Sequence, residues 1–359
     1  MRSTIFSCAK LVLRRTEQCT HRTIFHFPSR FSSSSASEKL DGQNKEVMIT
    51  KTNNSQINST IKGAPALQSD DTPLVDSLLA FTSSLVEPSK PNIVAFSGGV
   101  DSSLVAALVY RSFHSKTVKR NGSVKAVIGV SDSLPKRQLM LAQDVASSIG
   151  IDLMEVRTTE GTDETYIENK GQACFICKTH LYSALEAVSR KASEMSNGLD
   201  QDVILYNGTN KDDTSDSTRL GLVAASNFSV RSPLINITKD EVRRASKHLN
   251  LPNWNYAASP CLRSRLALGI EATESHLHAV NMAENRIRQI LNLDDTINMR
   301  VRMLAGKVAM IEVDREHLTS SSEENLRDKG FEQFCKELGF DGGMGIRAFK
   351  SGSVSRAIN

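Results

Sequence analysis

The sequence predicts an α/β protein in which a doubly wound parallel sheet is followed by a smaller α+β domain. Up to about residue 245, short apolar runs alternate with segments of helical spacing, a pattern typical of parallel strands joined by crossover helices. One of these runs ends in Ser97-Gly98-Gly99, directly before a helical pattern. Open α/β sheets bind ligands where their strands end, so this turn marks the expected site.

Apolar periodicity and turn residues set the order of the expected elements. They are a helix from Pro73, a strand before Ser97, a helix after it, a strand over 124–130, a helix over 136–149, a strand over 151–156 and a strand over 203–206. Gly150 closes the 136–149 helix. Short strands at 299–303 and 308–313, lying between helices, indicate the smaller domain.

The composition is that of a globular protein with room for two domains. The chain has 359 residues, of which 39% are hydrophobic and 23% charged. No uninterrupted apolar run approaches the roughly 20 residues that a membrane-spanning helix needs. The formal net charge is +4, but residues 1–37 hold six basic residues against Glu17 alone, so the remainder is nearly neutral. Such a chain has no general attraction for nucleic acid.

Residues 1–37 are expected to be an organelle-targeting peptide. They are rich in Arg and Ser, nearly free of acidic residues, and contain scattered Ile, Leu, Val and Phe. We expect import into the mitochondrial matrix, with a plastid as the alternative; a disordered basic tail has the same composition. Residues 38–72 are polar and are expected to form a disordered linker before domains over 73–245 and 246–359.

The turn after the first strand has the composition of a phosphate-binding loop. Glycines let the backbone approach an anion, and the next residues lie where a helix N-terminus offers unpaired N–H groups. Asp101 is a candidate Mg²⁺ ligand, because this ion combines one or two carboxylates with phosphate oxygens. The residues expected to hold phosphate are Ser97, Gly98, Gly99, Asp101, Ser102 and Ser103. The alternative is a tight turn in which a serine only caps the helix.

This stretch resembles the Ser-Gly-Gly-x-Asp-Ser pyrophosphatase loop of the adenine nucleotide α-hydrolase-like superfamily. It is not a Walker A loop, because no Gly-Lys-Ser/Thr follows. Members of the superfamily cleave ATP between the α and β phosphates and adenylylate a substrate. The resemblance therefore implies a Rossmann-like adenine nucleotide α-hydrolase fold and an ATP pyrophosphatase domain over 73–245. The resemblance does not identify the substrate that is adenylylated.

Three of the six cysteines form a candidate site. Cys335 lies alone in a helical pattern, where we expect a small buried residue. Cys174 and Cys177 form a C-x-x-C pair, which suits redox chemistry, zinc, an iron–sulfur cluster or no metal at all. Zinc needs a fourth soft ligand that is not evident, whereas a cubane cluster with one open iron needs only a third thiolate, such as Cys261.

Several ordered boxes resemble the LarE family, ATP-dependent sacrificial sulfur transferases that build the nickel-pincer nucleotide cofactor. The segment 169–182 is similar to that family's Asn-Pro-x-x-Arg-Cys-x-x-Cys-Lys-x-x-Leu-Tyr box. Further matches are Gly-Thr-Asn-x-Asp-Asp at 208–213, Arg-Ser-Pro-Leu at 231–234, Ala-Ser-x-Cys-Leu-x-Ser-Arg at 258–265, Arg-Val-Arg at 300–302 and Ile-Glu-Val at 311–313. The resemblance covers roughly residues 74–353.

The resemblance assigns roles to the cysteines. In the family, the cysteine that matches Cys261 receives the activated substrate and, in one subgroup, loses its own sulfur to become dehydroalanine. In another subgroup, the cysteines that match Cys174, Cys177 and Cys261 hold a [4Fe-4S] cluster whose extra sulfide is transferred. This chain has all three, which points to the cluster subgroup. Arg263 and Arg265 are expected beside Cys261, favouring a thiolate or holding a substrate phosphate.

Two further carboxylates are candidates for the ATP site. Asp213, after the fourth strand, either binds Mg²⁺ or caps a helix, and Glu312 is either a Mg²⁺ ligand or an exposed carboxylate on a strand. The chain also departs from the LarE boxes, most clearly at Ala173, where the family has Arg. These departures bear on the acceptor more than on adenylylation.

The predicted function is ATP-dependent sulfur transfer to an adenylylated carboxylate. The expected partners are ATP, Mg²⁺ and a small carboxylate of nucleotide-like character, in a homo-oligomer that binds neither membranes nor nucleic acid. The alternatives are an amide synthetase of the NAD or GMP synthetase type, an RNA-thiolating enzyme, and a nucleotide sensor without turnover.

Overall fold

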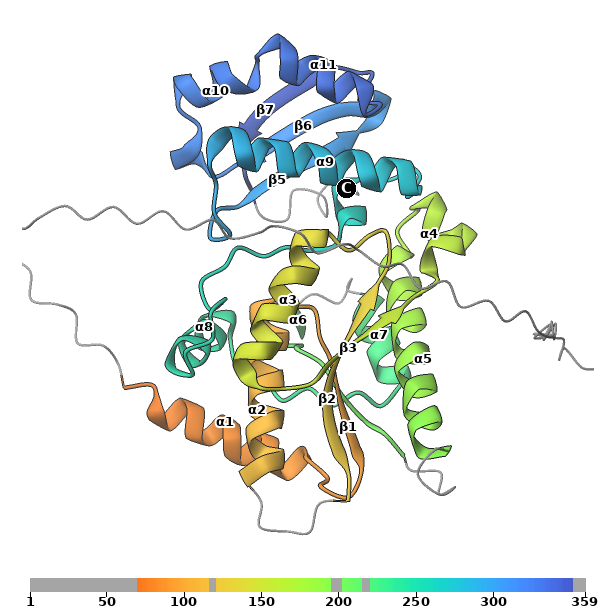
Figure 1. The fold of residues 1–359 in the computed structure, drawn as a ribbon, viewed down its shortest axis with the longest axis vertical. Coiled ribbons are helices and arrows are strands. Elements are labelled where there is room, and N and C mark those ends of the chain that lie inside the picture. Colours follow the sequence, from red (N-terminus) through yellow and green to blue (C-terminus); the bar gives the residue numbers. More distant parts are fainter. Residues whose placement is uncertain (1–69, 116–120, 195–201, 215–219, 351–359) are drawn as a thin grey trace, which may run out of the picture. The chain divides into compact units, whose positions relative to one another are not determined.

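The structure is a computed structural model that describes residues 70–115, 121–194, 202–214 and 220–350 (Figure 1). Residues Ala66–Asn359 form one compact unit, within which all of the following contacts lie. The expected targeting peptide, the linker up to residue 69, Cys8 and Cys19 lie outside the described residues. Among those described, no helix is long and apolar enough to cross a membrane.

The first sheet consists of four parallel strands in the order β3-β2-β1-β4. The strands are β1 (Pro91–Ala95), β2 (Ser123–Val130), β3 (Leu153–Arg157) and β4 (Ile204–Tyr206). Central strand β1 pairs Val94 with Ala126 of β2 on one side and with Tyr206 of β4 on the other. The parallel sheet expected from the sequence is therefore present, with each strand close to its expected position.

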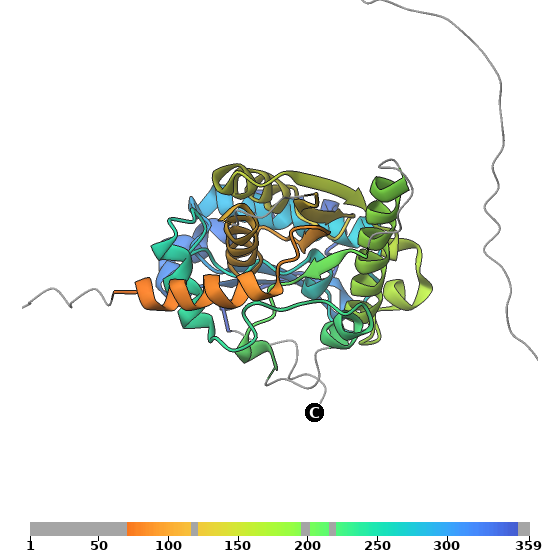
Figure 2. The same ribbon diagram turned by 90° about the horizontal axis from the view of Figure 1, so that it is seen from below.

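Helices cover both faces of this sheet, as a doubly wound fold requires. Val94 and Ala126 belong to a core shared with α1 (Thr72–Leu85), α2 (Val100–Ser115), α3 (Lys136–Ile149) and α8 (Lys239–His248). Their neighbours Ile93 and Val127 face the opposite way, into a core with α5 (Ala173–Glu194) and α7 (Leu220–Asn227). The two groups of helices lie on opposite sides of the strands in Figures 1 and 2.

Local signals explain where these helices begin and end. Gly150 ends α3 in the left-handed conformation, at φ 80°, as the sequence predicts. Thr238 and Glu241 form a capping box that starts α8. The sequence did not predict the short helices α4 (Glu164–Glu168) and α6 (Lys211–Thr214), because a single turn leaves no measurable periodicity.

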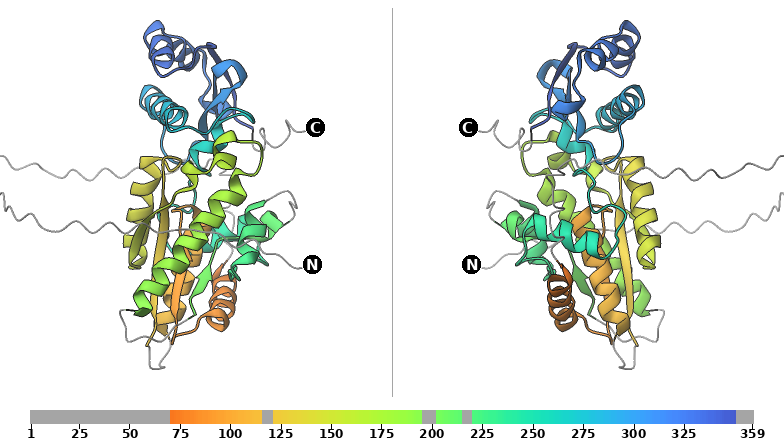
Figure 3. Two further views of the ribbon diagram at one scale, coloured as in Figure 1. Left: turned by 90° about the vertical axis from the view of Figure 1, so that its right-hand side faces the viewer. Right: turned by 90° about the vertical axis from the view of Figure 1, so that its left-hand side faces the viewer.

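The second sheet has three strands, in the order β5-β6-β7. Strands β5 (Met299–Leu304) and β6 (Val308–Val313), both expected from the sequence, are antiparallel, and β7 (Met344–Ala348) joins β6 in parallel. The helices are α9 (Glu274–Leu291), α10 (Ser320–Leu326) and α11 (Lys329–Glu337). They cover one face of the sheet (Figure 3), where Cys335 is 1% exposed, as predicted.

This second core also takes in residues from the first part of the chain. Tyr166 of α4 and Ala173, the first residue of α5, are buried in it together with Val301 and Ile311. The segment that carries the C-x-x-C pair therefore packs against the C-terminal domain, across the expected boundary at residue 245.

Because the strands of the first sheet are parallel, their carboxyl ends meet at one edge. The pyrophosphatase loop follows β1, Ser131 follows β2, the 3₁₀ turn η1 (Glu160–Thr162) follows β3 by two residues, and Asn207 follows β4. The turn η2 (Leu262–Arg265) reaches the same edge, where the Leu262 N–H donates to the Ser133 carbonyl over 2.8 Å. The fold thus brings Cys261 to the end of the sheet that carries the loop.

Candidate active site

The pyrophosphatase loop is a compact turn between β1 and α2. Gly98 has φ +69°, and an added Cβ there would lie 2.8 Å from the Ala142 Cα, so only glycine fits. The Ser102 hydroxyl donates to the Gly99 carbonyl over 3.0 Å and accepts the Ser97 N–H over 3.2 Å. The loop is therefore shaped before any ligand binds, with Ser97 exposed on its outer side.

Two of the loop's supports come from residues that the sequence did not single out. Asn253 donates to the Gly98 carbonyl over 2.8 Å and to the Ser103 hydroxyl over 3.0 Å, and Gln138 donates to the Ser97 carbonyl over 2.6 Å. Ser103 is fully buried. This corrects its expected role, because its hydroxyl faces the core and holds the loop in shape without reaching a phosphate.

Asp101 stands at the N-terminus of α2 with both carboxylate oxygens engaged. Its Oδ1 accepts from the Asn210 side chain over 3.0 Å, and its Oδ2 pairs with the ammonium of Lys239. Lys239 begins α8 and was not predicted, since nothing in its local sequence marks it as a ligand. It places a positive charge directly beside the loop.

Asp213 lies at the same edge of the sheet, where its carboxylate accepts a hydrogen bond from the backbone. Its Oδ2 accepts the Asn210 N–H over 3.3 Å, while its own N–H donates to the Asn210 side chain over 3.1 Å. This pair fixes the turn that presents Asn210 to Asp101. The turn comes so close to the loop that an added Cβ on Gly208 would lie 2.8 Å from the Ser102 nitrogen. The capping alternative for Asp213 matches these contacts.

The three predicted cysteines converge although Cys261 is far from the others in sequence. Cys174 and Cys177 lie on the first turn of α5, and Cys261 immediately precedes η2. All three are free thiols. Burial raises the pKa of Cys177 to about 12, with Lys178 opposing this and Cys261 and Cys174 adding to it. Among the described residues, no three His, Cys, Asp or Glu side chains are arranged to hold a single metal ion.

Arg263, which the sequence places two residues after Cys261, contacts Cys174 in the structure. One of its nitrogens donates to the Cys174 sulfur over 3.1 Å, and another donates to the Asn169 side chain over 2.7 Å. Burial alone would lower the pKa of Arg263, but Cys174 and Cys261 raise it overall. The guanidinium thus adds a permanent positive charge to the cysteine site, beside that of Lys178.

Asn169 joins the segments that carry the cysteines. It is fully buried and ends α4 in the left-handed conformation, at φ 53°. Its side-chain amide donates to the carbonyls of Ala267 and Ile270, both over 2.9 Å, while its oxygen accepts from Arg263. One side chain therefore ties the start of the C-x-x-C segment to the loop after Cys261.

Arg265 has a different role from the one predicted. It is 3% exposed, forms an ion pair with Glu284 over 2.9 Å, and donates to the carbonyls of Pro260 and Cys261. Its guanidinium therefore neither faces the Cys261 thiol nor remains open to solvent. It holds the backbone of the cysteine loop, which corrects the expectation that its guanidinium faces the Cys261 thiol.

Glu312 is likewise corrected. It lies on the face of the second sheet away from the helices, in register with Arg300 and Arg347 on the neighbouring strands. The side chain is fully buried; one oxygen accepts from Arg302 over 2.7 Å and the other from Arg347 over 2.9 Å. It is neither exposed nor open to Mg²⁺, because two guanidinium groups neutralise and enclose it.

Beside the cysteines lies a buried carboxylate that the sequence did not reveal. Glu160 is 2% exposed; its Oε1 accepts from the Ser131 hydroxyl over 2.7 Å, and Oε2 has no hydrogen-bond partner among the described residues. The charges of Glu160 and Cys177 influence each other. Only the fold brings the ends of β2 and β3 together here, so no local signal marks the position.

The chain is similar to known proteins over about half of its length. No family model matches the chain. An uncharacterized protein of Synechocystis, slr1717, is 36% identical over 200 residues, which cover 55% of this chain and 69% of that protein. The pyridinium-3,5-bisthiocarboxylic acid mononucleotide synthase of Lactiplantibacillus plantarum is 28% identical over 199 residues, covering 55% and 67%. The structure of NMN synthetase from Francisella tularensis aligns with a TM-score of 0.36 and 15% identity over 53% of this chain and 76% of that chain.

The relatives and the geometry support the same assignment. The pyrophosphatase loop lies at the end of a doubly wound parallel sheet, and the LarE-type cysteines and Arg263 lie at the same edge. The chain therefore belongs to the family of slr1717, and it is similar to the bisthiocarboxylic acid mononucleotide synthase, a LarE-type enzyme.

Proposed function

We propose that the protein is an ATP-dependent sulfur transferase that adenylylates a carboxylate of a small, nucleotide-like acceptor and replaces an oxygen of that carboxylate by sulfur at Cys261. The observation that carries this proposal is the convergence of Cys174, Cys177 and Cys261, with Arg263 between them, at the edge of the sheet that holds the loop. The relative named as a bisthiocarboxylic acid mononucleotide synthase supports both sulfur as the transferred atom and a nucleotide-like acceptor.

The loop residues bind the ATP phosphates in the first step. Ser97, the backbone at Gly99 and the N-terminus of α2 face the triphosphate, and Lys239 adds a charge to it. An acceptor carboxylate oxygen then bonds to the α-phosphorus, and the bond to the β-phosphate oxygen breaks to release pyrophosphate. The acceptor carbon becomes electrophilic because AMP is a good leaving group.

Asp101 is the residue that would hold Mg²⁺. Its Oδ2 is paired with the ammonium of Lys239, which would give way to a bound ion. The ammonium of Lys239 would then be free to pair with phosphate oxygens. The ion would supply charge neutralisation on the phosphates, while Asn210 keeps the carboxylate oriented through its bond to Oδ1.

The cysteine site fits an iron–sulfur cubane better than a single ion. A cubane bound by three cysteines takes one thiolate on each of three irons, so the three sulfurs need not converge on one point. Bound there, the cluster would supply sulfide for the transfer. Arg263 would balance the charge of the thiolates, and Asn169 would keep the two cysteine segments together.

Without a cluster, Cys261 itself supplies the sulfur. Its sulfur bonds to the activated acyl carbon and AMP leaves, which gives a thioester to the protein. A base then removes the Cα proton, the Cβ–S bond breaks, and the products are a thiocarboxylate and dehydroalanine at Cys261. Both routes use the same loop and the same position for the attacking sulfur.

The test is to compare acceptor-dependent pyrophosphate release with sulfide or with ammonium. The full chain, purified anaerobically, is incubated with ATP, Mg²⁺ and pyridinium-3,5-dicarboxylic acid mononucleotide, the oxygen counterpart of the relative's product. We expect pyrophosphate release and a thiocarboxylate product. An amide formed only with ammonium would replace the proposal by an amide synthetase, and no pyrophosphate with any acceptor would indicate a nucleotide sensor.

The expected site of action is also part of the proposal. The basic, Ser-rich residues 1–37 support import into the mitochondrial matrix. A fluorescent protein fused after residue 72 of this chain should be taken up by mitochondria, and the same fusion lacking residues 1–37 should not. Uptake by plastids instead would select the alternative.

A further inference from the structure

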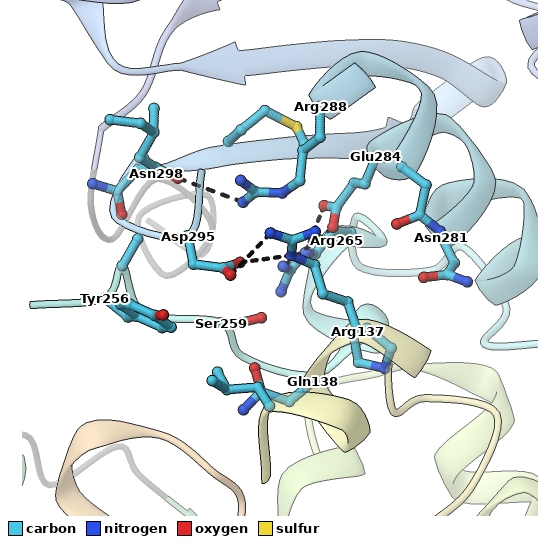
Figure 4. A pocket seen from close by; sticks show the side chains of 17 residues that line it. Arg137, Gln138, Tyr256, Ser259, Arg265, Asn281, Glu284, Arg288, Asp295 and Asn298 are labelled. Atoms are coloured by element: carbon cyan, nitrogen blue, oxygen red, sulfur yellow. Dashed lines mark hydrogen bonds and ion pairs between the residues drawn. The ribbon is translucent and has the colours of Figure 1, made fainter. Parts of the chain in front are cut away.

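We propose that a small cavity lined by α3, the loop before Cys261 and α9 binds an acidic group of the acceptor, with Arg288 as its principal cation (Figure 4). This inference rests on the proposed function only for the identity of the ligand; the anion site itself follows from the geometry. None of the sequence motifs discussed above includes Arg288.

The cavity has room for an acidic group. Its volume, counted as space open to the centre of a water molecule, is about 50 Å³. Because one water needs about 10–15 Å³ on this measure, a carboxylate or a phosphate group fits. Arg137, Asn285 and Arg288 also line an open groove of about 810 Å³ over α9 and α11, so the cavity has a way in from solvent.

The lining carries an excess of positive charge. Its ionised side chains are those of Arg137, Arg265, Arg288, Glu284 and Asp295. Both carboxylates are already paired: Asp295 accepts two bonds from Arg137, over 2.6 and 2.9 Å, and Glu284 accepts from Arg265 over 2.9 Å. The third arginine, Arg288, forms no ion pair among the described residues, and the nearby carboxylate of Asp294 acts on it only through its charge.

The guanidinium of Arg288 is held in place by the backbone and is suited to bind an anion. Its described hydrogen bonds go to the backbone carbonyls of Asp294, over 2.7 Å, and Ile297, over 3.4 Å, which orient the guanidinium without neutralising it. Burial and the neighbouring charges of Arg137 and Arg265 lower the pKa of Arg288, although Glu284 and Asp295 oppose this. A bound anion would relieve this accumulation of positive charge.

The cavity touches both halves of the reaction site. Gln138, in its wall, donates to the Ser97 carbonyl of the pyrophosphatase loop over 2.6 Å. Arg265, in the opposite wall, donates to the Cys261 carbonyl over 3.2 Å. In Figure 4, these walls enclose the space between α3 and α9. An acceptor anchored here by one acid lies next to both the activating loop and the sulfur loop.

The test is a binding measurement that needs no turnover. The full chain is first saturated with α,β-methylene-ATP, so that the pyrophosphatase loop is filled and cannot take up the probes. Inorganic phosphate and succinate are then titrated by calorimetry into the wild type, Arg288→Gln, Arg288→Lys and Arg286→Gln. Arg286 is the matched control, because it lies on the same helix and lines the open groove but not the cavity, so it separates binding in the cavity from binding in the groove.

We expect at least one probe to bind the wild type and Arg286→Gln alike, and to bind Arg288→Gln about tenfold or more weakly, since a charge-assisted bond is lost. Arg288→Lys, which keeps the charge, should recover part of the affinity. Phosphate alone binding would identify a phosphate subsite, and succinate alone a carboxylate subsite. The proposal is overturned if neither probe binds the wild type, or if Arg288→Gln binds as the wild type does while its unfolding temperature is unchanged.

Failure of this test is distinguishable from failure of the proposed function. An enzyme that makes a thiocarboxylate but shows no effect of Arg288→Gln on probe binding retains its function and loses only this subsite. Conversely, the protein could transfer no sulfur and still lose phosphate binding on Arg288→Gln. The anion site would then stand, and the proposed sulfur chemistry would be wrong.

Discussion

The pyrophosphatase loop and the cysteine site lie at the same edge of one sheet but are built differently. The loop is a continuous segment, Ser97 to Ser103, whose shape comes mostly from its own hydrogen bonds. The cysteine site combines the start of α5 with the turn before η2, and these are tied together by Asn169 and Arg263. A contiguous motif survives as a recognisable pattern in sequence, whereas an assembled site depends on contacts that only the fold creates.

The largest expected effect separates the two regions by function. Cys261→Ser should lower sulfur transfer about 10³-fold or more, because the substitution removes a thiolate ligand of the cluster in one route and the attacking sulfur itself in the other, while leaving acceptor-dependent pyrophosphate release in place. Transfer is measured as thiocarboxylate formed and activation as pyrophosphate. Cys335→Ala is the control, since that thiol is buried in the second core, away from the site. Equal loss of both activities in Cys261→Ser would mean that the two regions do not act separately.

A second substitution disturbs the loop from outside. Gly208→Ala would place a Cβ 2.8 Å from the Ser102 nitrogen, against backbone that cannot move freely. We expect weaker ATP binding and a loss of about 1–3 kcal/mol in the free energy of unfolding, as for other overpacked positions. Gly161→Ala is the matched control, because nothing lies within 4 Å of its added Cβ. Calorimetry with ATP and urea unfolding give the two quantities; equal behaviour of both variants would contradict the close approach.

The third prediction concerns the side chain that assembles the cysteine site. Asn169→Ala removes bonds to Arg263, Ala267 and Ile270, and should cost about 1–3 kcal/mol in unfolding free energy beyond its backbone effect. Asn292→Ala measures that backbone effect, because Asn292 is exposed and has φ 48°, close to the 53° of Asn169. Sulfur transfer should fall in Asn169→Ala with ATP affinity unchanged. Equal stability of the two variants would show that Asn169 does not tie the segments together.

The smallest predicted effect is a pH dependence of the metal-free protein. The pKa of Cys177 is raised to about 12 in the folded state, so the folded chain holds this proton more tightly than the unfolded chain does. The resulting stabilisation is complete below the ordinary thiol pKa of 9.0 and is lost as the pH rises from there through about 12. Urea unfolding from pH 8 to 11, with chelator present, should show a steeper decline for the wild type than for Cys177→Ala. Parallel curves would contradict a buried neutral thiol.

Most of the fold could be predicted from the sequence, because its signals are local and periodic. The strands β1, β2, β5 and β6 and helix α3 lie close to where apolar runs and Gly150 indicate them. Strand β7 was missed: it is five residues long and pairs with a distant strand, and its short run has no clear alternation. The strand conformation of β7 depends more on its pairing with β6 than on the sequence of β7 itself.

In the candidate site, the sequence identified residue types better than their orientations. Cys174, Cys177, Cys261 and Arg263 are near enough for their charges to influence one another, and their roles stay predictions. Arg265 was misjudged because a motif cannot tell whether a guanidinium faces a ligand or the backbone of its own loop. Lys239, Asn253 and Glu160 were missed because each reaches the site from a segment distant in sequence that carries no recognisable pattern of its own.

The central claim is that sulfur is delivered to the activated acceptor at Cys261, and one measurement tests it most directly. The full chain is purified anaerobically, its iron and acid-labile sulfide are determined, and a single turnover with ATP and the dicarboxylate mononucleotide is followed by mass spectrometry of the acceptor and of the peptide carrying Cys261. We predict bound iron and sulfide, an acceptor that has exchanged oxygen for sulfur, a matching loss of labile sulfide, and an intact Cys261. If the chain holds no iron and Cys261 is converted to dehydroalanine, the proposed sulfur transfer stands and the proposed cluster is wrong. AMP formed in step with the acceptor, while the acceptor gains no sulfur and neither Cys261 nor labile sulfide changes, would contradict the account.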